Sequence, residues 1–559
     1  MPRPAIRLLI LLVAALGLYL VGNGSVPLLD RDEPRYAQAS RQMLQSGDWV
    51  VPRFLDDIRA KKPPLIYWLQ ASSMRLLGDN AFAARLPSAL GVFLSAALLA
   101  VLVWRARGTD HAVWTTLIFC SSALTIVAAK SATTDAVLLL WTVIAQACLY
   151  AIWRGNRSWV VAIVLVVAIG LGLLTKGLIV GVVLATIAAL AFFRWTDHRR
   201  GVPPLAPRVA GEKPPQSGGL TDGAIRLAQT LVGLLILAAM LGPWVYLVHQ
   251  RAPDFLPEMF HEAAGHALQG KEGHGGPPGM HLLFIWADFL PWSLLLPFAV
   301  VAGWKRRDEP TVRFALAAVI GPWLMVELAI RTKLPEYMLP TIPALAFLTA
   351  DALVRSLRHR AEELSSRQFV GAAFIWAGVL ILISLLPWLA ALRFRPLPWT
   401  SMSILTVATV IWTLGVVWSL RRRQPAGAVA AMGLGMMCII AILYGIYLPR
   451  ARFLRLSILA ANVLRAHGAT GPCQSLMVDY KEPSLAFYEG GTIREMEHSQ
   501  TVISGKTDQW TSWMVITGDV WNRSSPAVRA HLQVIAHFRG LSVADSMRDV
   551  DVMIVHKNF

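Results

Sequence analysis

The most constraining feature of this 559-residue chain is a long series of apolar blocks, each close to the length that crosses a lipid bilayer. About 20 apolar residues span the hydrocarbon core as one helix, which satisfies its own backbone hydrogen bonds. We therefore predict an all-α polytopic membrane protein with about thirteen transmembrane helices. The blocks lie at approximately 7–23, 82–104, 112–129, 136–153, 159–174, 177–193, 226–248, 281–303, 313–330, 336–353, 369–391, 400–420 and 427–448.

The composition agrees with a membrane protein. Hydrophobic residues make up 55% of the chain and charged residues only 15%, whereas soluble globular chains carry about 25% charged residues. A soluble cytosolic enzyme, a disordered chain and a nucleic-acid-binding module are thereby excluded. Cys120, Cys148, Cys438 and Cys473 are scattered and form neither a disulfide framework nor a CxxC metal pattern.

Basic residues indicate how the chain crosses the membrane. No small-x-small cleavage pattern follows the first block, so we expect it to remain as an uncleaved anchor rather than a signal peptide. With the N-terminus inside, every inner connection carries at least two Lys or Arg, so thirteen spans place the C-terminus outside. These residues are Arg105, Arg107, Arg154, Arg157, Arg194, Arg199, Arg200, Lys305, Arg306, Arg307, Arg355, Arg358, Arg360, Arg421, Arg422 and Arg423.

Two polar parts then lie outside, and they suggest two domains, 1–449 in the membrane and 450–559 beyond it. The tail opens with an amphipathic helix near 455–467 and continues with short apolar runs, which predict a small α/β domain. It has no Gly-rich phosphate loop, so we expect an accessory or packing role. The other outer part is the loop 24–79, with eight Lys/Arg and seven Asp/Glu.

Loop 24–79 predicts two helices that lie along the membrane. Tyr36, Ala39 and Met43 fall on one face of the first, which ends at Gly47. The second begins at Pro63–Pro64, where prolines are natural at a helix start.

Asp32 and Glu33 open the first of these helices, and two interpretations compete. In one, Asp32 is an N-cap and Glu33 belongs to the first turn. In the other, the two carboxylates form a site with Arg35, Tyr36 and Lys62, because carboxylates orient or deprotonate an acceptor and cations hold a phosphate.

Further polar residues stand at outer helix ends. Asp135 begins a helix as a candidate site residue or an N-cap, and Lys176 interrupts an apolar hairpin. Arg331, Lys333, Glu336 and Tyr337 precede another helix. The loop 251–281 contains His261, Glu262, His266, His274 and His281 at spacings that fit no standard zinc signature, so a metal there is not predicted.

The stretches LLDRDEPRYAQASRQMLQSGDWVVP, KKPPLIYW and TKLPEYMLP resemble the bacterial lipid A aminoarabinose transferases. That family belongs to the protein O-mannosyltransferase-like group of integral-membrane glycosyltransferases. The likeness extends from the first to about the tenth span. It implies a GT-C-type fold of thirteen helices with an outer α/β tail in the bacterial inner membrane, the N-terminus cytoplasmic and the C-terminus periplasmic.

The resemblance also implies an activity. A family member transfers 4-amino-4-deoxy-L-arabinose from undecaprenyl phosphate to lipid A phosphates, giving polymyxin resistance. Asp32 matches the essential acid with Glu33 beside it, and Asp135 matches a second acidic position; these three are the expected catalytic residues. Arg35, Lys62, Lys176 and Lys333 match the expected phosphate-binding cations. Tyr36, Tyr337, His261 and Glu262 are the expected substrate-binding residues.

Two positions depart from the family pattern. Lys61 stands where relatives often have Glu, and the stretch PEMFHEAAGHAL at 257–268 has His261–Glu262 in reversed order with no Arg nearby. The acceptor role of that loop and the identity of the sugar therefore stay open.

The expected chemistry is a single inverting displacement that requires no cofactor. The partners would be the lipid-linked donor, lipid A and membrane lipids, with no nucleic acid, and the protein would be a monomer. Two alternatives remain: transfer of a polyprenyl-linked sugar to a protein or another glycan, and a non-enzymatic lipid flippase or transporter.

Overall fold

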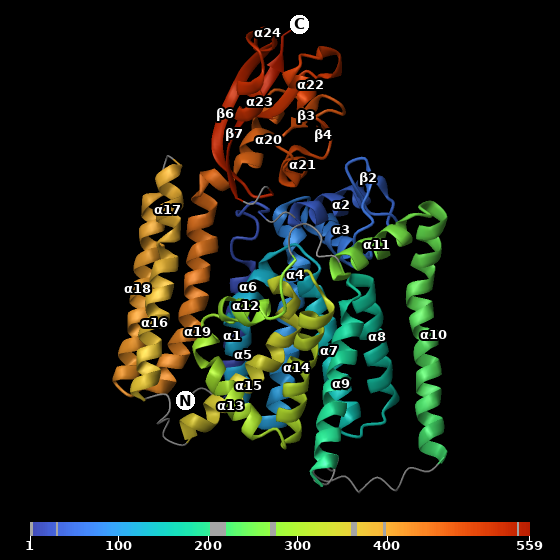
Figure 1. Ribbon diagram of the computed structural model, residues 1–559, viewed down its shortest axis with the longest axis vertical. Helices are drawn as coiled ribbons and strands as arrows, with labels where there is room; N and C mark the ends of the chain where they lie inside the picture. Colours follow the sequence, from blue (N-terminus) through green and yellow to red (C-terminus); the bar gives the residue numbers. More distant parts are fainter. Residues whose placement is uncertain are drawn as a thin grey trace.

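The computed structural model describes residues 4–29, 32–201, 220–268, 275–358, 366–394, 398–544 and 547–558. It has three parts, shown in Figure 1: a layer of long helices, a thin layer of short elements at one end of it, and a C-terminal domain beyond that end. The N-terminus lies near the opposite end of the helical layer (Figure 1).

The helical layer matches the apolar blocks of the sequence one for one. In the described part of the chain, nine helical segments are long and apolar enough to cross a membrane, two bent pairs pass the same test together, and α1 (Pro4–Leu20) and α8 (Trp159–Thr175) are shorter apolar helices. The nine include α4 (Ala81–Arg107), α7 (Asp135–Trp153), α9 (Leu178–Arg199), α10 (Leu220–Arg251), α14 (Pro310–Ala329), η3 (Pro335–Thr341) with α15 (Ile342–Arg358), α16 (Arg367–Ser384) with α17 (Leu386–Arg393), α18 (Trp399–Arg421) and α19 (Pro425–Ile442). The predicted multi-pass helical fold is confirmed.

Two of the blocks are broken rather than straight. The block 112–129 forms α5 (Thr109–Ser121) and α6 (Ala123–Lys130), bent by 61° at Ser122, whose backbone is extended. The block 281–303 forms α12 (Met280–Asp288) and then η2 (Trp292–Leu295) with α13 (Leu296–Lys305), bent by 119°. Pro291 at the second break has no N–H to continue the helix.

The thin layer at the end of the helices is built from loop 24–79. It contains α2 (Glu33–Ser46), α3 (Leu65–Leu77) and an unpredicted hairpin of β1 (Arg53–Phe54) and β2 (Asp57–Ile58). The helix α2 ends as predicted at Gly47, which has a φ of 73° and donates its N–H to the Met43 carbonyl over 3.1 Å. Glycine suits this left-handed position because it has no Cβ.

The C-terminal domain is the predicted α/β unit. Its five-stranded sheet has the order β4 (Arg494–Glu495), β3 (Ser475–Val478), β5 (Trp513–Thr517), β7 (Arg548–Lys557), β6 (Leu532–Ser542). The first three strands are parallel, and β7 pairs antiparallel with both β5 and β6. One face packs on α20 (Leu456–Ala466) and α21 (Pro483–Glu489), the other on α22 (Gln500–Ile503), α23 (Gly518–Arg523) and α24 (Pro526–Ala530).

The C-terminal domain sits directly on α2 through α21 (Figure 1). The Arg41 guanidinium lies 4.0 Å from the centre of the Phe487 ring, and the Leu28 N–H donates to the Tyr488 hydroxyl over 2.8 Å. Gln38 and Arg41 on the polar side of α2 are therefore buried. Periodicity predicted the apolar face of α2, but it gave no sign that a distant domain covers the polar face.

The predicted orientation can be tested by thiol labelling. Exposed Ser46 at the end of α2 and exposed Gln424 at the start of α19 lie at opposite ends of the helical layer. In a variant with the native cysteines replaced, we expect Ser46→Cys to react with an impermeant maleimide in intact spheroplasts and Gln424→Cys to react only after lysis. The reverse pattern would refute the orientation.

Candidate active site

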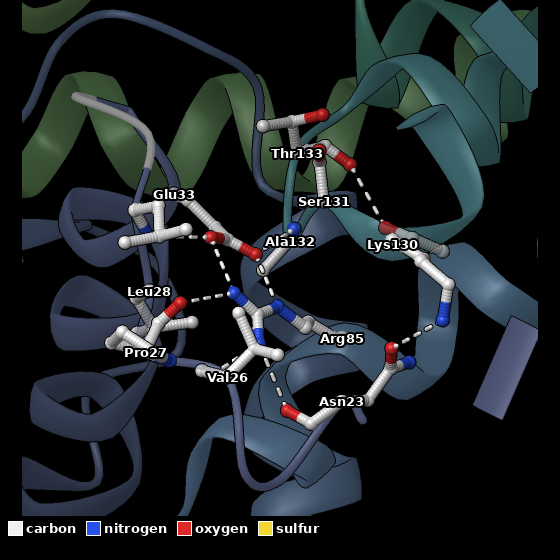
Figure 2. Close-up of polar contacts among 12 residues, drawn as sticks. Asn23, Val26, Pro27, Leu28, Glu33, Arg85, Lys130, Ser131, Ala132 and Thr133 are labelled. Atoms are coloured by element: carbon white, nitrogen blue, oxygen red, sulfur yellow. Dashed lines mark hydrogen bonds and ion pairs between the residues drawn. The ribbon is translucent and has the colours of Figure 1, made fainter. Parts of the chain in front are cut away.

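The first structural feature of the site is a buried ion pair between Glu33 and Arg85, shown in Figure 2. Arg85 Nε and Nη2 donate to the two Glu33 carboxylate oxygens over 2.6 and 2.8 Å. Its remaining N–H groups bind the carbonyls of Asn23, Val26 and Pro27 over 2.7–2.9 Å, so all five guanidinium donors are used. Glu33 also accepts from the backbone N–H groups of Leu29 and Ala132.

This pair fixes where the site residues begin. It joins the start of α2, the loop after α1, the helix α4 and the loop before α7 (Figure 2). Ala132 lies three residues before Asp135, the first residue of α7, so the anchor places Asp32 and Asp135 relative to one another. With four hydrogen bonds accepted, the Glu33 carboxylate has no lone pair left for a substrate. The catalytic role expected for Glu33 stays a prediction, and the geometry favours a positioning role.

Asp32 lies beside the anchor but in a different environment. Its side chain is 58% exposed, and within the described chain it makes no capping hydrogen bond to α2 although it occupies the N-cap position. One oxygen lies 3.7 Å from Nη2 of Arg59. The side-chain cap expected under the structural interpretation is therefore absent there, and the carboxylate is presented at the surface of the site.

Arg59 connects Asp32 to two buried tyrosines. Its Nε donates to the Tyr67 hydroxyl over 3.2 Å, and its guanidinium lies 5.0 Å from the centre of the Tyr36 ring. The Tyr36 and Tyr67 rings are 5.5 Å apart. Burial raises the pKa of Tyr36, and the neighbouring Tyr67 and Asp32 raise it further, so the phenol stays neutral at physiological pH.

Asp135 and Lys176 form a second ion pair on the same side. Lys176 Nζ donates to an Asp135 oxygen over 2.8 Å and lies 4.9 Å from the centre of the Tyr337 ring. Burial opposes the charge of Lys176, but Asp135, Tyr337 and Glu336 outweigh it and raise the pKa of the ammonium. Three residues predicted from separate segments of the sequence therefore meet here.

Lys62 completes the group. Its ammonium makes no hydrogen bond or ion pair with the described residues, although Lys176, Asp32, Asp135 and Arg59 all act on it electrostatically. Burial, followed by the charge of Lys176, lowers the pKa of Lys62 to about 8. We call Asp32, Arg59, Lys62, Asp135 and Lys176 the polar cluster; its three cations and two carboxylates leave one positive charge in excess.

Lys333 is held in a different way from Lys62. Its ammonium donates to the carbonyls of Val326, Glu327 and Ile330 at the end of α14, over 2.6–3.0 Å, and lies 3.5 Å from the Glu327 carboxylate. These bonds use all three ammonium donors. The phosphate-binding role expected for Lys333 stays a prediction, and the contacts favour a helix C-cap.

Three further expected residues, Glu262, His261 and Arg35, are not part of the polar cluster. Glu262 on α11 (Phe255–Leu268) accepts from Lys61 over 2.6 Å, which ties α11 to the loop before α3, while His261 is exposed. Arg35 lies in the first turn of α2 and lines a cavity against the C-terminal domain. His266 has no described side chain and His274 lies outside the described residues; in the described part of the chain no three His, Cys, Asp or Glu side chains gather as metal ligands.

Sequence reasoning missed Arg59 and Arg85. Arg85 had a usable signal, because a charged residue inside the apolar block 82–104 must find a partner. Arg59 had none, since it is one of eight basic residues in its loop and only the β1–β2 hairpin turns it toward Asp32.

The anchor makes a stability prediction. Both Glu33 and Arg85 side chains are 3% exposed, so removing one partner strands a buried charge. We expect Arg85→Met to lower the free energy of unfolding by about 3–5 kcal/mol, seen as a lower melting temperature of the detergent-purified protein. Exposed Arg75→Met on α3 is the control and should leave it unchanged. An unchanged melting temperature for Arg85→Met would contradict the anchor.

Known proteins resemble this chain in sequence and in fold. Residues 5–205 match the family described as dolichyl-phosphate-mannose-protein mannosyltransferase. The chain is 32% identical over 381 residues to an undecaprenyl phosphate-alpha-4-amino-4-deoxy-L-arabinose arabinosyl transferase of Pseudomonas savastanoi pv. phaseolicola, covering 67% of this chain and 66% of that protein. A relative of the same name from Yersinia pestis is 34% identical over 343 residues, covering 59% and 56%. The chain thus spans about two thirds or less of the length of these curated relatives.

The crystal structure of ArnT from Cupriavidus metallidurans bound to undecaprenyl phosphate superposes with a TM-score of 0.74 at 21% identity, covering 98% of this chain and 97% of that one. At this identity the likeness establishes the fold. The sequence relatives and the family match show that the chain belongs to the protein O-mannosyltransferase-like family of integral-membrane glycosyltransferases, in the branch that contains the undecaprenyl phosphate-aminoarabinose arabinosyl transferases.

Proposed function

We propose that this protein transfers 4-amino-4-deoxy-L-arabinose from undecaprenyl phosphate to phosphate groups of lipid A. The observation that carries the proposal is the ammonium of Lys62, which stands without an ion-pair partner among the described residues, next to Asp32, Asp135 and Lys176. An excess cation in a partly buried site is suited to an anionic ligand such as a phosphate. The names of the sequence relatives support the sugar and its carrier.

In this proposal Lys62 binds the donor phosphate. The polyprenyl chain of the donor lies in the bilayer, so its phosphate reaches the ends of the helices, where the polar cluster is. Lys176 is already paired with Asp135 and contributes mainly to the local field, and Arg59 holds Asp32. Lys62 then supplies the charge-assisted hydrogen bond that stabilises the phosphate as a leaving group.

Asp32 orients the acceptor. A phosphate is largely ionised near neutral pH because its second pKa is about 6, so the acceptor needs little help from a base. Its oxygen attacks the anomeric carbon of the sugar, a new carbon–oxygen bond forms, and the bond to the donor phosphate breaks with the electron pair leaving on undecaprenyl phosphate. One displacement inverts the anomeric centre. Asp32 accepts the remaining acceptor proton and keeps the attacking oxygen in line.

In this proposal the transfer takes place on the periplasmic side of the inner membrane. The polar cluster and the C-terminal domain lie at the same end of the helical layer (Figure 1), which we assign to the periplasmic side of the inner membrane from the basic bias of the opposite connections. There the added amino sugar would offset lipid A phosphate charge and weaken binding of cationic peptides such as polymyxin. We propose that the protein does so as a monomer and without a cofactor.

A second acceptor class follows from the family match. Residues 5–205 fit a family described by transfer to protein, so a protein or another glycan is the alternative acceptor. Purified protein incubated with the lipid-linked donor and lipid A, followed by mass spectrometry, separates the possibilities. Aminoarabinosylated lipid A supports the proposal; sugar on protein alone contradicts it, and movement of the donor without a glycosylated product indicates a flippase.

Asp32 provides a direct test of the acceptor step. Asp32→Asn keeps the size of the side chain and removes its charge, and the side chain makes no cap bond whose loss could unfold α2. We expect transfer to fall at least about hundredfold while the melting temperature stays within experimental error. Near-normal turnover would exclude Asp32 and direct attention to Asp135.

Lys62 provides the corresponding test for the donor. Loss of one charge-assisted hydrogen bond costs about 1.5–3 kcal/mol, so Lys62→Gln should lower kcat/KM for the donor about ten- to hundredfold. Arg75→Gln, the same charge change at an exposed position of α3, is the matched control. A change of less than twofold for Lys62→Gln would exclude phosphate binding at this position.

The pH profile gives the same test a second readout. Because the pKa of Lys62 is lowered to about 8, its ammonium is charged at neutral pH and loses its proton as the pH rises through that value. We expect kcat/KM for the donor to fall above about pH 8 in the wild type and to remain flat in Lys62→Arg, since a guanidinium stays charged. An identical alkaline decline in both proteins would assign the titration to another group.

A further inference from the structure

A polar cavity of about 490 Å³ lies between the C-terminal domain and α2. Its volume is within the range of about 300–1,000 Å³ typical of small-molecule sites. It is lined by four carboxylates, three basic side chains, Thr517, Ser542 and the Asn522 amide, with few apolar groups. The proposed roles of Asp32 and Lys62 do not involve this cavity.

The topology of the sheet explains why these side chains meet. The parallel strands β3 and β5 end at Val478 and Thr517, and the antiparallel strand β7 begins at the same edge. Asp479, Asp519 and Asp551 therefore project at the carboxyl edge of the parallel strands, where ligands of open α/β sheets bind.

Local contacts fix the side chains that form the walls of the cavity. The Thr517 hydroxyl donates to Asp479 over 2.7 Å. A Cβ on Gly518 would come within 3.0 Å of the Asp551 Cβ, so a larger residue would crowd this wall. Buried Glu482 accepts from the Ser542 hydroxyl and the Ala544 N–H over 2.6 and 3.0 Å, which ties the end of β6 to the segment that follows β3.

The cavity reaches the proposed reaction centre through Arg35. This residue lines the cavity from the first turn of α2, and Asp32 precedes it by three residues, which is about one helical turn. A ligand that fills the cavity can therefore extend a substituent to Asp32 without leaving the surface of α2.

The lining selects the chemistry of the ligand. Carboxylates accept hydrogen bonds from sugar hydroxyls, the Asn522 amide both donates and accepts, and Arg35 and Lys481 offer charged donors to a phosphate. An acyl chain gains nothing in such a lining because it would desolvate charged groups. Asp549 is satisfied by Arg393 and Arg539 over 2.6 and 2.8 Å. Among the described residues, the Asp479 carboxylate accepts one hydrogen bond, from Thr517, and Asp519 faces only an exposed Arg523 at 3.3 Å, so each keeps acceptor capacity for hydroxyls.

We propose that this cavity binds the phosphorylated sugar headgroup of the acceptor glycolipid, with its hydroxyls on Asp479, Asp519 and Asn522 and its phosphate toward Arg35. The inference rests on the proposed transfer to a glycolipid phosphate and adds a role for the C-terminal domain. The acyl chains of the acceptor remain in the membrane, and the domain sets which headgroup is presented to Asp32.

Two variants test the cavity at positions away from the reaction centre. Asn522→Trp fills it, and Asp519→Asn removes one acceptor charge on an exposed side chain of α23. We expect each to raise the KM for lipid A at least fivefold, with the KM for the lipid-linked donor and the kcat at saturating lipid A within twofold of wild type. The matched controls Gln509→Trp and Asp508→Asn, exposed residues of the same domain outside the lining, should change none of these values.

A binding measurement separates this inference from the proposed function. A water-soluble, acyl-free glucosamine disaccharide bisphosphate is titrated into the detergent-purified full-length protein by calorimetry. Binding to the wild type that is lost in Asn522→Trp supports the cavity even if no transfer is detected, a result that would refute the proposed function alone. Transfer by the wild type with an unchanged lipid A KM and unchanged disaccharide binding in both variants overturns the cavity assignment and leaves the proposed function intact.

Discussion

The structure depends on one buried interaction, the pairing of Glu33 with Arg85 at the end of the helical layer (Figure 2). Charges are buried only when paired, and here every donor of the guanidinium and every acceptor site of the carboxylate is used. Because the bonds reach four separate segments, the loop after α1, the start of α2, α4 and the loop before α7 are fixed together. A fully hydrogen-bonded buried network specifies one arrangement of these segments, whereas a buried network with unpaired polar groups would destabilise the fold.

The polar cluster is built on this anchor, and its electrostatics decide what it can bind. Lys176 balances the charge of Asp135, and Arg59 balances that of Asp32 at a longer distance. The positive charge of Lys62 is therefore available to a ligand. Lys333 differs from Lys62. It is also a lysine beside a proline-containing turn, but it donates its three N–H groups to the last carbonyls of α14. A lysine near the headgroup level therefore becomes a candidate site residue only when its own helix does not use its donors.

Local sequence signals predicted local structure well. Apolar length located the spans, Gly47 the end of α2, and the prolines at 63 and 64 the start of α3. The breaks at Ser122 and Pro291 escaped prediction because an apolar run looks the same in a straight and a bent span. Asp32, Lys62, Asp135, Lys176 and Tyr337 were identified by motif, and the structure brings them together. Three features arise from long-range contacts that no sequence pattern encodes. Glu33 is buried in an ion pair while Asp32 is exposed, Arg59 lies beside Asp32, and the C-terminal domain covers α2.

The most direct measurement is an electron cryomicroscopy structure of the full-length protein in lipid nanodiscs containing undecaprenyl phosphate. We expect density for the phosphate within hydrogen-bonding distance of Lys62 Nζ, with the Asp135–Lys176 pair intact and the polyprenyl chain running between the helices. Phosphate density at Lys333, or at the end of the helices that bears Arg421 and Arg422, with Lys62 vacant, would contradict this expectation.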